Sequence, residues 1–217
     1  MSKALPTRGR HLNHVARLYD PLVERLSFGR EQRFRRQTLK HMQIRVTDQI
    51  LDVGCGTGSL SLMVAQRLGR GGMVVGIDAA PEMIRIALRK AVEQDAWTCF
   101  TTGVAESLQF PDASFDWVVN SMFTHHLDTE LKERAFSEMY RVLKPGGRMV
   151  TADIDRPSTI WGVLIGWGAR FILLQPELID NLRGDLPDLM RAAGFRHVRR
   201  AEQLYGLVSF FTAEKTG

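Results

Sequence analysis

A glycine-rich turn follows a short apolar stretch in the run Ile50-Leu51-Asp52-Val53-Gly54-Cys55-Gly56-Thr57-Gly58. Three glycines within five residues let the backbone turn tightly and approach a ligand with no Cβ in the way. The spacing is G-x-G-x-G, and Ser59 stands where the third glycine of the dinucleotide pattern G-x-G-x-x-G would fall. The turn therefore predicts a site for a nucleotide-like cofactor, with a spacing unlike that of dinucleotide sites.

A carboxylate lies where it could hold the ribose of such a cofactor. Asp78 closes the apolar run 73–77, about 20 residues after the glycine turn. An acid at the carboxyl end of a second parallel strand can accept hydrogen bonds from both ribose hydroxyls. Its alternative role is to cap the helix expected from Pro81, and the two roles are compatible.

Two adjacent histidines could supply acid–base chemistry. His125 and His126 follow a predicted strand over 114–120, at the mouth of the predicted site. Imidazole titrates near neutrality, so either side chain could deprotonate a phenol or an enol, and we favour His126. The alternative is that both shape the pocket wall or cap the helix expected from Asp128.

The elements that must position these residues alternate along the chain. Apolar runs and helical periodicity predict strands at 50–53, 73–78, 97–101, 114–120 and 148–153, with helices at 59–68, 81–94 and 128–143. Lys144-Pro145-Gly146-Gly147 ends the last helix. The order predicts an open α/β sheet with right-handed crossovers. A helix at 185–193 and strands at 195–201 and 206–212 complete the pattern.

Composition indicates an ordinary globular protein. The 217 residues are 44% hydrophobic and 24% charged, which suits one domain, and the net charge of +5 permits an anionic partner without selecting one. The two cysteines, Cys55 and Cys99, lie far from metal-ligand spacing, so we expect no metal site, no disulfide framework and a cytoplasmic location. The N-terminal stretch has no apolar core of a signal peptide, and the longest apolar stretch is too short to span a bilayer.

Two segments outside this alternation have open roles. A helix at 31–42 is densely basic, which suits either a solvated face or a face that binds an anion such as a cofactor carboxylate, a lipid headgroup or RNA. The segment 157–174 is apolar nearly all round and contains Trp161 and Trp167. It suits a lid over an apolar acceptor, a helix on a membrane surface, a homodimer contact or ordinary core packing.

With these pieces assembled, residues 15–213 resemble the class I S-adenosylmethionine (SAM) dependent methyltransferases, and among them the ubiquinone/menaquinone-biosynthesis C-methyltransferases of the methyltransferase type 11 group. The matching motifs are the glycine turn, Gly76-Ile77-Asp78 with Met83, the segment 105–116, and Arg141-Val-Leu-Lys-Pro-Gly-Gly147. The resemblance implies a Rossmann-like α/β fold, a mostly parallel seven-stranded sheet with a final antiparallel strand and helices on both faces. In a single domain 1–217, it implies a helical cap (1–45), a SAM-binding core (46–153), an apolar lid insert (154–184) and a C-terminal helix with a strand hairpin (185–217).

The resemblance also assigns cofactor contacts. It implies that the glycine turn packs under the methionine part of SAM, that Asp78 binds the ribose, and that Ala79 and Met83 flank the adenine. It also implies that the backbone of Val104 and Ala105 lies near the adenine edge and that the backbone carbonyl of Asn120 accepts from its amino group. The implied cofactor-binding residues are Tyr19, Asp52, Gly54, Cys55, Gly56, Asp78, Ala79, Met83, Val104, Ala105 and Asn120. One departure is Val104, because the family usually has an acid there for the adenine amine. The backbone of Ala105 and the side chain of Glu106 could substitute, and one lost hydrogen bond costs only about 1 kcal/mol.

The expected function is therefore methyl transfer from SAM, with S-adenosylhomocysteine as product, to a small lipophilic acceptor by quinone-like C- or O-methylation. One alternative is N-methylation of a phospholipid headgroup, with the arginine-rich helix holding the phosphate. Another is a SAM-binding partner subunit without catalysis, for which Val104 is the hint. Nucleic acid is not expected, because the basic residues are not interleaved with stacking aromatics. Asn120-Ser121-Met122-Phe123 also departs from the Asn-Pro-Pro-Tyr pattern of methyltransferases that act on exocyclic amines.

Overall fold

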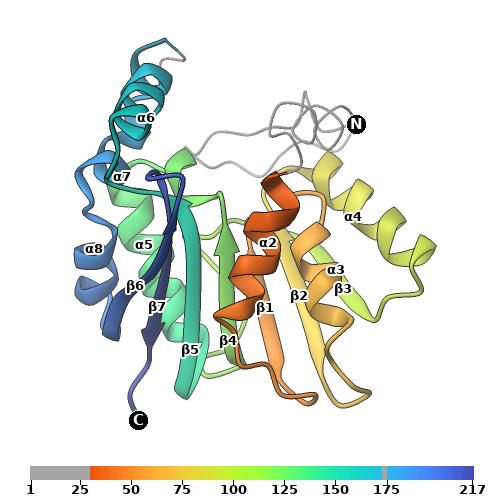
Figure 1. Ribbon diagram of the computed structural model, residues 1–217. Coiled ribbons are helices and arrows are strands. Elements are labelled where there is room, and N and C mark those ends of the chain that lie inside the picture. The colour runs from red at the N-terminus through yellow and green to blue at the C-terminus, as the bar shows by residue number, and fades with distance from the viewer. Residues whose placement is uncertain (1–29, 173–174) are drawn as a thin grey trace.

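Seven strands form one sheet in the computed structural model, which describes residues 30–172 and 175–217 (Figure 1). The strand order is β3-β2-β1-β4-β5-β7-β6. All neighbouring pairs from β3 to β5 are parallel, whereas β7 runs antiparallel to β5 and to β6. The strands are β1 (Gln49–Val53), β2 (Met73–Asp78), β3 (Thr98–Thr102), β4 (Phe115–Ser121), β5 (Leu143–Ile154), β6 (Arg196–Leu204) and β7 (Val208–Glu214). The predicted fold class is confirmed.

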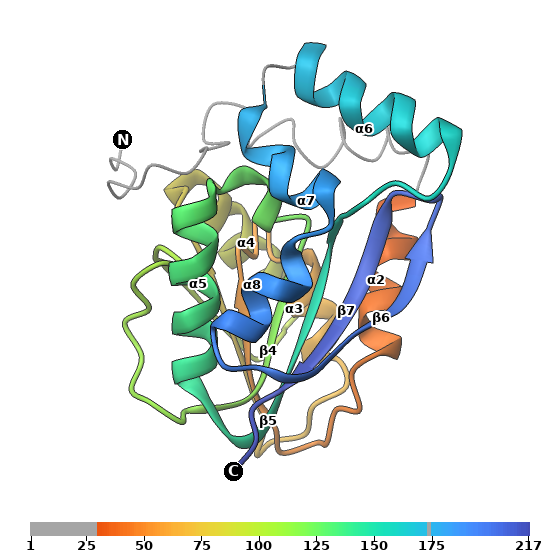
Figure 2. The ribbon, with the colours of Figure 1, turned by 90° about the vertical axis from the view of Figure 1, so that its left-hand side faces the viewer.

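Helices cover both faces of this sheet (Figures 1 and 2). One face carries α2 (Arg30–Lys40), α3 (Ser59–Ala65) and α4 (Pro81–Glu93), and the other carries α5 (Thr129–Val142) and α8 (Leu186–Ala192). Asp128 accepts a hydrogen bond from the backbone N–H of Leu131 at 2.9 Å and so caps α5. Tyr19, in the helical cap implied for residues 1–45, lies outside the described residues, so its contact with the cofactor stays a prediction.

The packing of the core explains why the parallel strands are continuous apolar runs in the sequence. Ile50 and Val119 pack toward α2 and α3, whereas Leu51 and Val118 pack toward α5 and α8. Successive side chains of a strand point to opposite faces, so a strand buried on both faces needs apolar residues at every position. The buried sheet holds the carboxyl ends of its parallel strands at one edge.

The described residues of the segment 154–184 form three short elements at that edge. They are α6 (Ile160–Ile172), the 3-10 turn η2 (Pro176–Leu178) and α7 (Ile179–Arg183). A further 3-10 turn, η1 (Thr124–His126), follows β4 and was not predicted from the sequence. Within the described ranges, no helix combines the length and apolar character needed to cross a membrane.

Candidate cofactor-binding and active site

A cavity lies over the carboxyl ends of β1, β2 and β4, where the strand order changes direction. Open α/β sheets bind ligands at this kind of switch point. Its described lining comes from α2, the glycine turn, the end of β2, the loop after β3 and the segment after β4. Nine of the predicted cofactor-binding residues line it: Asp52, Gly54, Cys55, Gly56, Asp78, Ala79, Met83, Val104 and Ala105.

The glycine turn is shaped for close approach. Gly54 has a φ of 71°, and a Cβ on it would lie 2.2 Å from Cδ2 of Phe123. Gly56 has a φ of 54°, and a Cβ on it would meet no atom within 4 Å. Gly54 therefore makes room for an aromatic ring of the cavity wall, while Gly56 faces open space. Its neighbour Cys55 is buried, and burial raises the pKa of its thiol, which keeps it protonated.

Asp78 joins the glycine turn to the loop before α4. Its Oδ2 accepts a hydrogen bond from the Gly56 N–H at 2.9 Å, and its Oδ1 accepts one from the Ala80 N–H at 2.8 Å. A carboxylate offers about four acceptor sites, so these backbone donors leave a role toward ribose hydroxyls compatible with the geometry. The carboxylate also lines the cavity. The predicted position of Asp78 at the cavity is thus observed, and its ribose contact stays a prediction.

Asp52 brings a second acid to the same wall. The Ser61 hydroxyl donates to Asp52 Oδ2 at 2.5 Å. Burial raises the pKa of Asp52 to about 6, and the nearby Asp78 adds to the rise, while the Ser61 hydrogen bond and Arg35 oppose it. Arg35, from the basic helix α2, lines the cavity with Asp52. An acid and a guanidinium side by side suit the ammonium and carboxylate of an amino acid.

The opposite part of the wall could enclose an adenine. Ala79, Met83, Val104 and Ala105 line it, and Met83 and Ala105 are buried. Glu106 also lines the cavity, so an acid is present two residues after the position where the family usually has one. Ala105 and Glu106, the two residues that could replace the acid missing at position 104, therefore both lie in the cavity wall.

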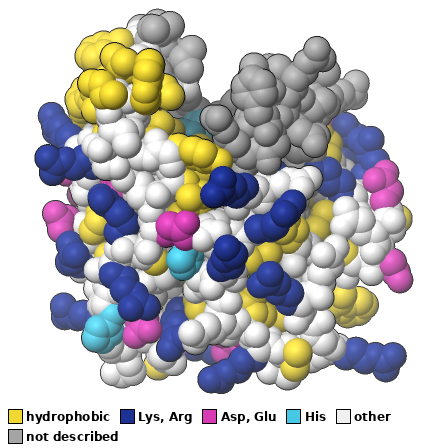
Figure 3. All heavy atoms as spheres, viewed as in Figure 1, with side chains coloured by type: hydrophobic (Ala, Val, Ile, Leu, Met, Phe, Trp, Pro, Cys, Tyr) yellow, Lys and Arg dark blue, Asp and Glu magenta, His cyan; other side chains and the backbone are white. Residues whose placement is uncertain are grey.

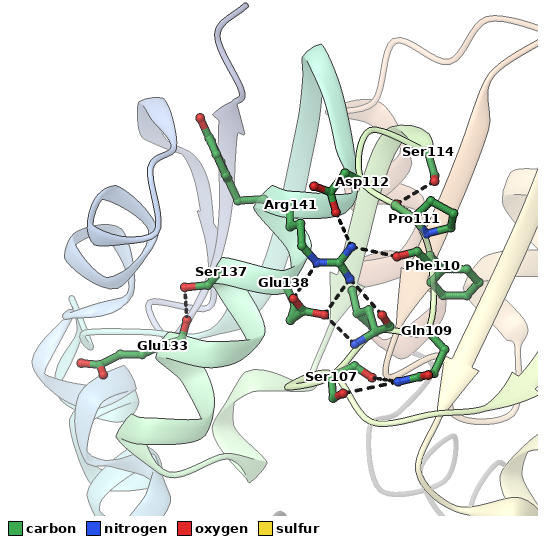
Figure 4. A network of polar contacts seen from close by, with 12 residues as sticks. Ser107, Gln109, Phe110, Pro111, Asp112, Ser114, Glu133, Ser137, Glu138 and Arg141 are labelled. Atoms are coloured by element: carbon green, nitrogen blue, oxygen red, sulfur yellow. Dashed lines mark hydrogen bonds and ion pairs between the residues drawn. The ribbon is translucent and has the colours of Figure 1, made fainter.

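Arg141 holds the loop that carries this part of the wall (Figure 4). Its guanidinium donates to the carbonyls of Phe110 at 2.8 Å and Leu108 at 2.9 Å, and forms ion pairs with Glu138 and Asp112. Glu138 in turn accepts the Leu108 N–H at 2.7 Å. The hydrogen bond from Arg141 lowers the pKa of Glu138, which keeps the pair charged. The arginine of the Arg-Val-Leu-Lys-Pro-Gly-Gly motif therefore anchors the loop 106–112 on α5.

The two histidines point to different places. His126 lines the cavity, whereas the buried His125 places Nδ1 2.6 Å from Oδ1 of Asp153 at the end of β5. Asp153 also accepts the Phe123 and Thr124 N–H groups, at 3.0 and 2.6 Å. Burial alone would raise the pKa of Asp153, but the charge and hydrogen bond of His125, the Thr124 hydroxyl and the Ile154 N–H lower it to about 2. His125 is therefore part of the scaffold of η1, and only His126 stays a candidate base.

Asn120 is the other predicted residue that the cavity lining does not include. Its side chain is buried and donates to the Thr151 hydroxyl at 3.0 Å. The three residues that follow it, Ser121, Met122 and Phe123, do line the cavity. The contact implied for the Asn120 backbone carbonyl with the adenine amine stays a prediction. The Asn120 side chain joins β4 to β5 behind the site.

Sequence reasoning missed several wall residues. Phe34, Met122 and Phe123 line the cavity, and Asp153 organises the turn beside it. Met122 has a φ of 53°, an uncommon conformation for this residue type that occurs often at functional sites. Asp153 had a usable signal, because it ends a predicted strand at the same sheet edge as Asp78. Phe34 had none, since nothing local marks which face of a basic helix meets the sheet.

These features fit SAM. The cavity combines the side chains of Asp52 and Arg35, an open glycine turn, a carboxylate on the adjacent strand and an apolar slot. Residues 50–147 match the family described as a methyltransferase domain. A SAM-dependent methyltransferase from Methanosarcina mazei has a similar structure, with a TM-score of 0.64 and 26% identity over 82% of this chain and 97% of that one. The chain belongs to the class I SAM-dependent methyltransferases, and SAM is its cofactor.

Sequence relatives place the chain in the UbiE-like group of this class. A demethylmenaquinone methyltransferase from Thermus thermophilus is 40% identical over 67% of this chain and 64% of the relative. The ubiquinone/menaquinone biosynthesis C-methyltransferase UbiE of Geobacter sulfurreducens is 29% identical over 93% of this chain and 85% of the relative. The match to the Thermus relative thus spans just under two thirds of that protein's length. The resemblance inferred from the motifs is confirmed.

Proposed function

We propose that the protein transfers a methyl group from SAM to a small lipophilic acceptor, with C- or O-methylation of a quinone-like ring as the leading reaction. The observation that carries the proposal is the second half of the cavity. Beyond the charged and polar side that suits SAM, the described wall contains Met122, Phe123 and Leu127 beside the imidazole of His126. An apolar wall with one titratable group suits a ring that carries a hydroxyl.

The chain's own groups would position the reactants and accept a proton. SAM supplies a methyl group on a positively charged sulfonium, which leaves as a neutral thioether. Asp78 and the glycine turn would fix the cofactor, and the apolar wall would hold the acceptor in line and exclude water. His126 would accept the proton of the acceptor hydroxyl, which makes the oxygen or the neighbouring ring carbon a better nucleophile. The names of the two quinone-pathway relatives support this acceptor class.

The test is methyl transfer from labelled SAM to defined acceptors, with products identified by mass spectrometry. The panel contains a reduced short-tailed demethylmenaquinone analogue, a catechol and phosphatidylethanolamine. We expect label in the quinol or catechol product. Label in phosphatidylethanolamine would replace the proposal by headgroup N-methylation, and SAM binding without transfer to any acceptor would favour a non-catalytic partner subunit.

A further inference from the structure

Helix α6 turns its large apolar side chains away from the protein. Its residues Ile160, Trp161, Leu164, Ile165 and Phe171 are between 57% and 71% exposed. A surface helix ordinarily buries its large apolar residues and exposes polar ones. The polarity of α6 is therefore the reverse of that of a helix whose environment is water.

The inner face of α6 explains how the helix is held. Gly162 and Gly166, four residues apart, are the buried positions among the residues of α6 whose side chains the structure describes. A Cβ on Gly162 would lie 2.4 Å from the carbonyl oxygen of Gly206, and one on Gly166 would lie 2.7 Å from Cδ2 of Leu182. Each glycine lowers helix stability by about 1 kcal/mol relative to alanine. Glycine thus permits the contact with the β6–β7 hairpin and α7, and leaves the large residues outside.

The exposed face lies at the functional edge of the molecule. Figures 1 and 2 show α6 beyond the carboxyl ends of β4 and β5, the edge that carries the cavity. Figure 3 shows the apolar surface of this helix as a continuous patch at the top of the molecule. The described lining of the cavity includes no residue of α6. The lid suggested by the sequence stays a prediction, and the exposed apolar side chains of α6 face outward.

Arginines flank this apolar face. Arg156 and Arg183 are exposed and lie near the start of α6, where a Cβ on the intervening Gly184 would sit 3.1 Å from Cβ of Arg156. Two acids of this part of the chain, Asp155 and Asp180, are buried, whereas Asp185 is half-buried. Asp155 is buried and bonds Ser209 and Arg200, and Asp180 is buried against Lys132. The flank therefore presents positive charge outward.

We propose that α6 docks the protein onto an anionic membrane surface. Its 13 residues extend about 20 Å, too short to cross a hydrocarbon core of about 30 Å, so the helix would lie in the plane of the interface. The five large side chains enter the boundary between headgroups and acyl chains, while Arg156 and Arg183 meet lipid phosphates. A second copy of the chain is a less suitable partner for this face, because a twofold contact would bring Arg156 and Arg183 of both copies close together. The purpose of the docking rests on the proposed function, since a lipophilic acceptor resides in that layer.

Co-sedimentation of the full chain with vesicles tests the apolar contact. We expect binding to equal mixtures of phosphatidylglycerol and phosphatidylcholine, weakened by at least about tenfold in Leu164→Gln/Ile165→Gln. The matched control is Val92→Gln/Trp97→Gln, because these two apolar side chains are 82% and 75% exposed but lie outside α6. Equal binding by all three proteins would overturn the proposal, as would absence of binding by the wild type.

A second pair of variants tests the charge. Arg156→Gln/Arg183→Gln should weaken binding to the anionic vesicles, whereas Arg70→Gln/Arg89→Gln removes the same charge from exposed positions elsewhere and should not. Sedimentation velocity separates the dimer: if Leu164→Gln/Ile165→Gln turns a dimer into a monomer while vesicle binding is unchanged, α6 is a subunit contact. Turnover of a water-soluble acceptor should survive in this variant. If the wild type does not bind vesicles but still methylates the acceptor, only the docking proposal is wrong. If the wild type binds vesicles but shows no methyl transfer, only the proposed reaction is wrong.

Discussion

Asp52→Asn should stabilise the protein without cofactor at neutral and basic pH. Burial raises the pKa of the Asp52 carboxyl from its ordinary 3.8 to about 6. One pKa unit corresponds to about 1.4 kcal/mol, so the ionised carboxylate costs the fold on the order of 3 kcal/mol above pH 6. Because the folded chain binds this proton more tightly than the unfolded chain, the cost is absent below about pH 4 and grows as the pH rises to about 6. Asparagine removes the charge and can still accept the Ser61 hydrogen bond.

Thermal unfolding at two pH values measures this effect. In a chain of this size 1 kcal/mol shifts Tm by about 2–4 °C, so Asp52→Asn should raise Tm by several degrees near pH 8 and change it little near pH 4. The matched control is Asp188→Asn, which removes one acid whose side chain is 81% exposed and should show no such pH-dependent gain. Equal Tm changes for Asp52→Asn at both pH values, or a loss near pH 8, would refute burial as the origin of the shift.

The same carboxylate should link SAM binding to pH. If the ionised form of Asp52 binds the SAM ammonium, Kd should rise about tenfold per unit as the pH falls below 6 and stay level above it. Asp52→Asn should bind SAM more weakly near pH 8 and lose this dependence. Calorimetric titrations with SAM from below pH 6 to pH 8 measure this dependence. If the Kd of Asp52→Asn varies with pH as that of the wild type does, Asp52 does not bind the SAM ammonium.

Asp78→Ala should weaken SAM binding by about 1–3 kcal/mol in calorimetry, because it removes the acceptor of the Gly56 N–H and of the predicted ribose hydroxyls. His126→Ala should lower turnover with little change in SAM affinity, measured by steady-state kinetics and calorimetry. Gly54→Ala should reduce the free energy of unfolding by about 1–3 kcal/mol in urea, because its Cβ would lie 2.2 Å from the Phe123 ring at a φ of 71°. Asp153→Asn should lower stability at pH 7, and the loss should shrink in acid unfolding as the pH falls from about 4 toward 2, since the pKa of Asp153 is lowered to about 2.

Each of these expectations has a contrary result. Unchanged SAM affinity in Asp78→Ala would show that this carboxylate does not bind the ribose. Full turnover in His126→Ala would show that the imidazole only lines the cavity and is not a base. Adding Phe123→Ala to Gly54→Ala relieves the collision and leaves only the backbone strain. If the double variant is no more stable than Gly54→Ala, the ring is not the cause. A stability loss in Asp153→Asn that is the same at pH 2 and pH 7 would argue against the ionised carboxylate.

The parts of the site that the sequence predicted are those whose cause is local. Gly54 and Gly56 mark a turn because few other residues adopt a positive φ, and Asp78 marks a strand end because a buried apolar run stops there. Parallel strands share one carboxyl edge, so these residues had to converge on it. The basic helix, by contrast, left open whether it meets solvent or a ligand, and only its packing on the sheet brought Arg35 to the cavity.

The sequence alone settled the cofactor-binding turn, the order of strands and helices, and the family, because short-range backbone geometry and burial on both faces leave a direct trace in residue type. Tertiary structure decided which of two adjacent histidines meets the cavity, since Asp153 lies 28 residues beyond His125 and holds it away. It also decided which way α6 faces. A helix that is apolar all round has no polar stripe to mark its outer side, so its orientation depends on where Gly162 and Gly166 find backbone and side chains close enough to require glycine.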